Sequence, residues 1–131
     1  MKKLMSIILS ALMLSGCTGA SDQTNNTYRQ ITMDEAVIMM EEKTGYIILD
    51  VRRADEFAAG HIPGAINVAN ESIGTSEIPE LPDKDQLIMV YCRSGRRSKE
   101  ASEKLVKLGY TNIVEFGGIL DWKGETVTGQ K

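Results

Sequence analysis

The sequence has no apolar run long enough to cross a membrane, only two cysteines and no excess of positive charge. Its longest apolar run, Leu4 to Leu14, covers eleven residues, whereas a membrane-spanning helix needs about 20. Lysine and arginine number 15 against 18 aspartate and glutamate residues, a net charge of −3. Because a nucleic-acid-binding protein needs a broad basic face, we expect no nucleic-acid partner. We find no internal repeat, and 131 residues suffice for one domain with a substantial core.

The N-terminal residues are patterned like an export signal. Lys2 and Lys3 precede the apolar run, and Ser15, Gly16 and Cys17 follow it. A charged region before a short apolar stretch is typical of a signal peptide, and the ending Leu-Ser-Gly-Cys resembles the lipobox of bacterial lipoproteins. That resemblance implies cleavage after residue 16 and attachment of acyl chains, such as palmitate, to Cys17. An ordinary or uncleaved secretory signal with an incidental cysteine is the alternative.

A lipid on Cys17 would anchor the exported protein to a bacterial membrane, with its domain facing the periplasm or the cell exterior. Residues 17–27 are polar and without periodicity, which is typical of a flexible tether, so we expect the folded domain to cover residues 28–131. Removing residues 1–16 deletes two lysines and no acidic residue, which changes the net charge from −3 to −5. Cys92 is then the only free thiol, and no internal disulfide can form.

Cys92 opens a loop that points to nucleophilic chemistry. The apolar run 87–91 predicts a strand, residues 98–108 predict a helix, and Cys-Arg-Ser-Gly-Arg-Arg lies between them. Backbone N–H groups in such a loop, together with the helix N-terminus, can hold an anion. Three arginines within five residues of the thiol favour its thiolate. The alternative is a small buried hydrophobic residue, but guanidinium groups beside it would resist burial without partners.

Strands and helices alternate along the rest of the domain. Thr32 and Glu35 fit a capping box at the start of a helix. An uninterrupted apolar run at 46–49 is typical of a strand buried on both faces. We further expect short helices at 53–59 and 119–122, strands at 66–68 and 112–116, and a turn at Gly117-Gly118. This order predicts an α/β fold with a mainly parallel sheet.

Two charged residues directly follow the first buried strand. In an open parallel sheet the carboxyl ends of the strands form the ligand crevice, so Asp50 and Arg52 are candidates for the same rim as Cys92. Asp50 is expected to fix loop conformation rather than act as a base. Arg52 could reach the crevice or pair with Glu56, and the sequence favours neither. His61, between glycine and proline turns, is expected to make a structural hydrogen bond.

Four motifs in this order resemble the single-domain rhodaneses, a family of sulfurtransferases. They are Asp50-Val51-Arg52, then Glu56-Phe57 with Gly60-His61-Ile62-Pro63-Gly64-Ala65, then Cys92-Arg93-Ser94-Gly95-Arg96-Arg97-Ser98, and Gly117-Gly118-Ile119 with Trp122. The resemblance runs from about residue 28 to 124. It implies a rhodanese-like single domain, with a mainly parallel central sheet flanked by helices.

The resemblance also implies a reaction. The Cys92 thiolate would take the outer sulfur of thiosulfate or a related small anionic donor as a persulfide. A thiol or cyanide acceptor would then remove that sulfur. Backbone N–H groups from Ser94 and Gly95 through Ser98 would stabilise the terminal sulfur, and Arg93, Arg96 and Arg97 would bind the anionic end of the donor. No metal or organic cofactor is required.

Two other functions use a similar loop. A cysteine-dependent phosphatase or arsenate reductase places histidine before the cysteine and arginine six residues after it, to clamp the phosphoryl group. Here Tyr91 and Ser98 occupy those positions, and Arg97 falls one residue short. A sulfur carrier or redox sensor without turnover would use the same thiolate, and the sequence alone does not separate it from an enzyme.

Overall fold

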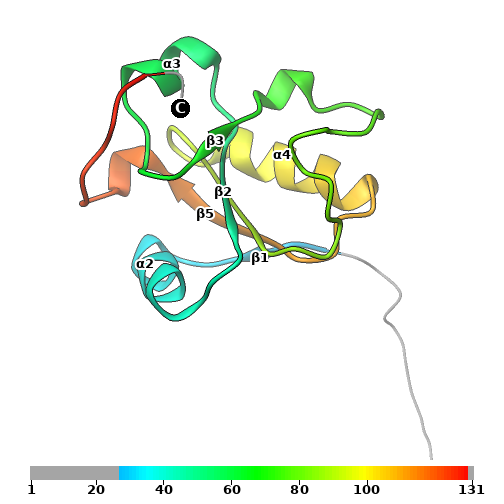
Figure 1. Cartoon of the computed structure of the whole chain (residues 1–131), viewed down its shortest axis with the longest axis horizontal. Helices are drawn as coiled ribbons and strands as arrows, with labels where there is room; N and C mark the ends of the chain where they lie inside the picture. The colour runs from blue at the N-terminus through cyan, green and yellow to red at the C-terminus, as the bar shows by residue number, and fades with distance from the viewer. Residues whose placement is uncertain (1–26, 130–131) are drawn as a thin grey trace, which may run out of the picture.

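The computed structural model describes residues 27–129 (Figure 1). The predicted leader at 1–16 and Cys17 lie outside the described residues, as does the predicted tether except for its last residue. Within residues 27–129, every helix is too short or too polar to cross a membrane.

A five-stranded parallel sheet forms the centre of the domain, with strand order β1-β5-β4-β2-β3. In chain order the strands are β1 (Arg29–Gln30), β2 (Ile47–Asp50), β3 (Ile66–Asn67), β4 (Ile88–Cys92) and β5 (Ile113–Gly118). The apolar runs of β2 and β4 lie next to each other in the middle, buried on both faces as such runs require. The predicted α/β fold with a mainly parallel sheet is therefore confirmed.

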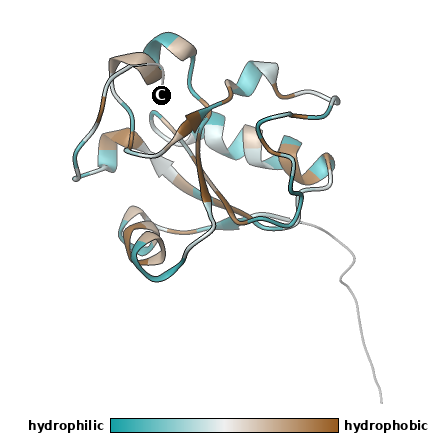
Figure 2. Cartoon of the chain, in the orientation of Figure 1, coloured by the Kyte–Doolittle hydropathy of each residue, from teal (hydrophilic) through white to brown (hydrophobic). Residues whose placement is uncertain are grey.

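Helices cover both faces of this sheet (Figure 1). They are α2 (Met33–Glu42), α3 (Ala54–Ala59) and α4 (Arg96–Lys107), with short 3₁₀ turns η3 (Asn70–Ser72) and η4 (Ile119–Asp121). Successive strand residues point to opposite faces, so two apolar clusters form. Figure 2 shows the central strands as apolar, whereas α4 carries both apolar and polar residues.

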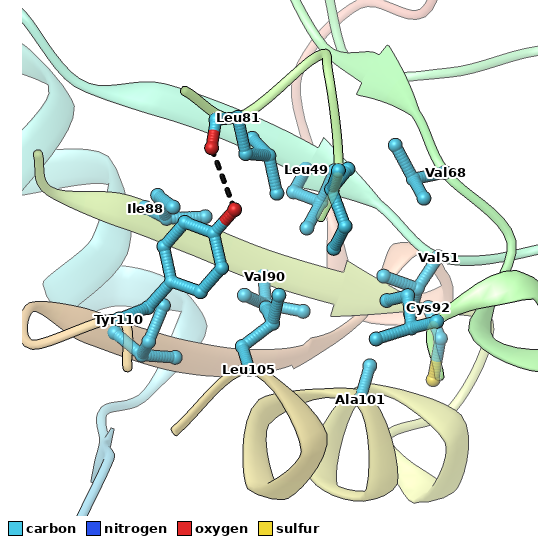
Figure 3. Packing of buried hydrophobic residues seen from close by; sticks show 13 residues of the cluster. Leu49, Val51, Val68, Leu81, Ile88, Val90, Cys92, Ala101, Leu105 and Tyr110 are labelled. Atoms are coloured by element: carbon cyan, nitrogen blue, oxygen red, sulfur yellow. Dashed lines mark hydrogen bonds between the residues drawn. The ribbon is translucent and has the colours of Figure 1, made fainter. Parts of the chain in front are cut away.

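The larger cluster joins α4 to the sheet. Ala101 and Leu105 of α4 pack with Val90 of β4 and with residues of β2, and Cys92 belongs to the same cluster. Figure 3 shows Cys92 at one end of this packed layer, beside Val51 and Ala101. On the opposite face, α2 and α3 pack against alternate residues of β2 and β4, among them Met89. The backbone of Cys92 is thus held by a rigid core.

Two predicted boundaries are wrong in ways that matter for the loop. The helix after Cys92 begins at Arg96 rather than Ser98, so Arg96 and Arg97 lie in its first turn. The predicted turn at Gly117-Gly118 is the end of β5, where a register shift pairs Gly118 with Cys92. The capping box of α2 is confirmed, because Thr32 and Glu35 exchange both hydrogen bonds at 2.8 and 3.0 Å.

Candidate active site

The loop after β4 directs a backbone donor at the thiol. Gly95 caps α4 with φ of +118°, a left-handed conformation that glycine adopts without steric cost. Its N–H donates to Cys92 Sγ across 3.0 Å. The thiol also donates to Ser98 Oγ at 3.4 Å. The sulfur therefore lies at the positive end of a helix with one amide aimed at it, an arrangement that stabilises a negatively charged sulfur.

Cys92 lines a cavity of about 600 Å³. Most of the residues around it are charged or polar. The lining is formed by Arg53, Glu56, Asn70, Glu71, Cys92, Arg93, Ser94, Arg96, Arg97 and Glu100. The structure thus brings the thiol and all three predicted loop arginines to one cavity, together with Arg53 and three glutamates that the sequence analysis did not assign to the site.

The three loop arginines differ in how they are held. Arg97 donates to both carboxylate oxygens of Glu56, at 2.7 and 3.1 Å, and both side chains are less than one-fifth exposed. Arg96 pairs with Glu100 of the next helical turn at 3.1 Å. Arg93 makes no salt bridge within residues 27–129. Arg93 is therefore the loop arginine whose charge is least satisfied inside the protein.

Glu56 and Arg97 each stabilise the charged form of the other. The Arg97 guanidinium is the main reason that the pKa of Glu56 falls from 4.5 to about 2. In return, the hydrogen bond to Glu56 raises the pKa of Arg97, and the nearby charge of Cys92 adds to this effect. Glu56 thus holds Arg97 as a permanent positive charge in the same cavity as the thiol.

Asp50 and Arg52 are not among the residues that line the cavity, and the Asp50 carboxylate accepts the Arg52 N–H at 2.9 Å in the loop that follows β2. Arg52 neither reaches the crevice nor pairs with Glu56. Its guanidinium donates to Asp50 at 2.7–3.1 Å and to the Gly60 carbonyl at 2.7 Å. Both side chains are almost fully buried, and although burial opposes the charge of Arg52, Asp50 outweighs it and the pKa of Arg52 is raised. This pair ties β2 to the α3 connection.

The predicted structural role of His61 agrees with its contacts. The ring is fully buried, stacks on Phe57 with 3.6 Å between centroids, and shares a 2.8 Å hydrogen bond between Nδ1 and the Phe57 carbonyl. Between residues 27 and 129, no three histidine, cysteine, aspartate or glutamate side chains cluster closely enough to hold a metal ion.

Two residues of β5 support the loop, a role that the sequence analysis assigned to neither of them. Gly118 has no room for a side chain, because a Cβ there would lie 2.0 Å from the Arg93 carbonyl oxygen and 2.5 Å from Ser94 Cα. Glu115 is 2% exposed and accepts a 2.5 Å hydrogen bond from Ser98 Oγ. The signal for Glu115 was a single acidic residue inside an otherwise apolar strand.

Both the sequence and the fold are similar to those of known proteins. Residues 32–125 match the model of the rhodanese-like domain. Thiosulfate sulfurtransferase PspE of Escherichia coli is 36% identical over 73 residues, covering 56% of this chain and 70% of PspE. Thiosulfate sulfurtransferase GlpE of Pseudomonas entomophila is 31% identical over 107 residues, covering 78% of this chain and 94% of GlpE. The solved structure of a rhodanese with anions from E. coli is 33% identical with a TM-score of 0.59, covering 64% of this chain and 99% of that chain.

Proposed function

The chain belongs to the rhodanese-like family, and from this premise we propose that it is a sulfurtransferase that carries a sulfane sulfur on Cys92. The observation that carries the proposal is the 3.0 Å hydrogen bond from the Gly95 N–H to Cys92 Sγ, because the thiol lines a cavity that four arginines also line. A thiolate in that position is stabilised, and an anionic donor is attracted to it.

The reaction has two displacements at sulfur. In the first, the Cys92 thiolate attacks the outer sulfur of thiosulfate, the bond between the two donor sulfurs breaks, and sulfite leaves with the electron pair. Cys92 then carries a persulfide whose terminal sulfur is anionic. In the second, a thiolate or cyanide attacks that terminal sulfur, and the Cys92 thiolate is the leaving group. Splitting one transfer into two displacements is the general advantage of covalent catalysis.

Thiosulfate is the donor that the site supports best. Thiosulfate is a dianion, and within residues 27–129 Arg93 makes no salt bridge that would compete for it. Two relatives that carry the name thiosulfate sulfurtransferase point to the same donor.

The proposal is tested by measuring the intact mass of the full-length protein before and after thiosulfate. We expect a gain of one sulfur atom that disappears when cyanide or a thiol is added, and no gain in Cys92→Ser. Gain without release would indicate the carrier or sensor function instead of turnover. No gain in protein whose Cys92 is reduced would overturn the sulfurtransferase proposal.

A phosphatase function is disfavoured, because a serine occupies the position of the phosphatase arginine. The residue six positions after Cys92 is Ser98, whose side chain is fully buried and bonded to Glu115. Neither group can clamp a phosphoryl dianion bidentately, as arginine does. Hydrolysis of a phosphoester model compound by the natural protein, absent in Cys92→Ser, would reverse this conclusion.

We also propose that Cys17 carries a lipid and that the domain lies outside the cytoplasm on a bacterial membrane. The support is the charged and apolar pattern of residues 2–14 and the lipobox-like residues that end at Cys17. Mass spectrometry of the N-terminal peptide from expressed full-length protein should find an acylated Cys17 as the first residue. An unmodified cysteine, or an N-terminus that retains Met1, would refute the anchor.

A further inference from the structure

Behind the thiol lies a buried acidic residue for which the two-step reaction has no use. Glu115 of β5 is 2% exposed, and Ser98, which is fully buried, lies between it and Cys92. The Ser98 hydroxyl donates to Glu115 Oε2 at 2.5 Å, and the Cys92 thiol donates to Ser98 Oγ at 3.4 Å. The N–H of Gly117 also donates to Glu115 Oε2, at 2.9 Å. Cys92, Ser98 and Glu115 thus form one hydrogen-bonded row.

A hydroxyl group has one proton to donate, and this decides which way the hydrogen bonds of the row run. Ser98 Oγ lies within hydrogen-bond distance of the Gly95 and Gly117 carbonyls, at 2.9 and 3.3 Å, but Glu115 is its shortest acceptor. A carboxylate attracts a hydroxyl proton more strongly than a neutral carbonyl does. With its proton committed to Glu115, Ser98 presents only lone pairs to Cys92. It can accept the S–H proton but cannot donate to a thiolate.

We propose that Glu115, acting through Ser98, is a positioning residue that opposes ionisation of Cys92. Its consequence for sulfur transfer rests on the proposed function. A thiol that ionises less readily is a stronger nucleophile once ionised and a poorer leaving group. Glu115 therefore favours attack of Cys92 on the donor and retention of the persulfide. The Gly95 N–H and the arginines have the opposite effect, because they favour ionisation of the thiol.

Other charged groups lie around Cys92. The positive ones are Arg53, Arg93, Arg96 and Arg97 in the cavity and Lys99, whose Nζ lies 3.4 Å from the Gly95 carbonyl. The negative ones in the cavity are Glu56, Glu71 and Glu100. On its other side, Glu115 acts on Tyr28 next to β1, whose pKa is raised chiefly by burial and further by the charges of Glu103 and Glu115. All of these groups are unchanged in Glu115→Gln, so that substitution isolates the carboxylate.

The test is the pH dependence of Cys92 alkylation by iodoacetamide in the full-length protein. Trypsin releases Cys92 in the peptide 85–93, so its modification is read separately from Cys17. In Glu115→Gln we expect the pH midpoint of alkylation to fall by about one unit. Because nucleophilicity falls with basicity, the rate should rise about threefold below the midpoint and fall about threefold on the high-pH plateau. The two profiles therefore cross.

Crossing profiles separate this role from simple loosening of the loop, which would raise the alkylation rate at every pH. The matched control is Glu103→Gln, the same loss of charge at an exposed position of α4, and its profile should match that of the natural protein. In a Ser98→Ala background, Glu115→Gln should shift the midpoint by less than one-third as much, because the connecting hydroxyl is gone.

An unchanged profile in Glu115→Gln would overturn the proposal. A full shift that survives in the Ser98→Ala background would also overturn it, because the carboxylate would then act without Ser98. If Glu115→Gln does not fold, Ser98→Ala alone must still lower the midpoint. Failure of the natural protein to gain sulfur from thiosulfate would refute the proposed function instead, and the alkylation result does not depend on it.

Discussion

Replacing Glu56 by glutamine should show how much the ion pair between Glu56 and Arg97 stabilises the folded protein. Glu56 accepts two hydrogen bonds from Arg97 and one from the Arg53 N–H at 3.0 Å. Glutamine has nearly the same shape and keeps an oxygen for the Arg53 N–H, so the start of α3 is preserved. What is lost is the negative charge opposite Arg97, a side chain that is 18% exposed.

The magnitude follows from the lowered pKa of Glu56. The gap between 4.5 and about 2 corresponds to at most about 3 kcal/mol of folding free energy at pH 7. A carboxylate with a lowered folded pKa stabilises the protein above its unfolded value of 4.5, and that contribution is lost as the pH falls through about 2. At pH 3 about 1 kcal/mol of it remains.

Urea unfolding of the natural protein and of Glu56→Gln measures this contribution directly. We expect a loss of about 3 kcal/mol at pH 7 that falls to about 1 kcal/mol at pH 3. Glu42→Gln, an exposed glutamate at the end of α2, is the control and should change stability by less than about 0.5 kcal/mol. A loss at pH 7 that is equally large at pH 3 would refute the assignment to an ion pair.

Four further substitutions, one of them with a matched control, test the loop and the residues that support it. Arg93→Ala should raise the KM for thiosulfate about tenfold. Arg96→Ala should raise this KM by a smaller factor, because Arg96 already pairs with Glu100. Equal increases in KM would contradict the different roles given to the two arginines. Gly118→Ala should reduce the rate of persulfide formation at least about 100-fold, because the added Cβ would lie 2.0 Å from the Arg93 carbonyl oxygen. The control is Gly74→Ala, which has open space around the added Cβ and should not change the rate. Full activity of Gly118→Ala would show that the loop moves easily to make room for the Cβ. Asp50→Asn should cost about 3 kcal/mol in urea unfolding because it leaves Arg52 buried without its charge partner, and a change below about 1 kcal/mol would contradict that role.

Local patterns in the sequence predicted much of this domain. The capping box at Thr32 and Glu35 is satisfied within four residues, so it depends on nothing distant. The apolar runs that became β2 and β4 indicated strands buried on both faces, and such strands have few alternatives to a parallel sheet. The cysteine loop was recognised as a whole, because a strand, a glycine and a basic helix start are all encoded within eleven residues.

Predictions of side-chain contacts failed where several partners were possible for one charged side chain. Arg52 was expected in the crevice or on Glu56, but Asp50 lies within reach two residues away and the Gly60 carbonyl completes its contacts. Glu56 is consequently available to Arg97, 41 residues further along the chain. Local sequence lists the possible partners of a charged group, but only the packed fold decides which of them is near.

The sequence by itself determined that Cys92 ends a buried strand and enters a glycine-containing loop at a helix N-terminus, because backbone propensity and apolar pattern act over short distances. The tertiary structure alone decided what surrounds the sulfur. It brought Glu56 from α3 to restrain Arg97, and it brought β5 against the loop, with Gly118 touching its backbone and Glu115 behind Ser98. These contacts join segments 17 to 41 residues apart, and their geometry is set by the packing of whole strands and helices.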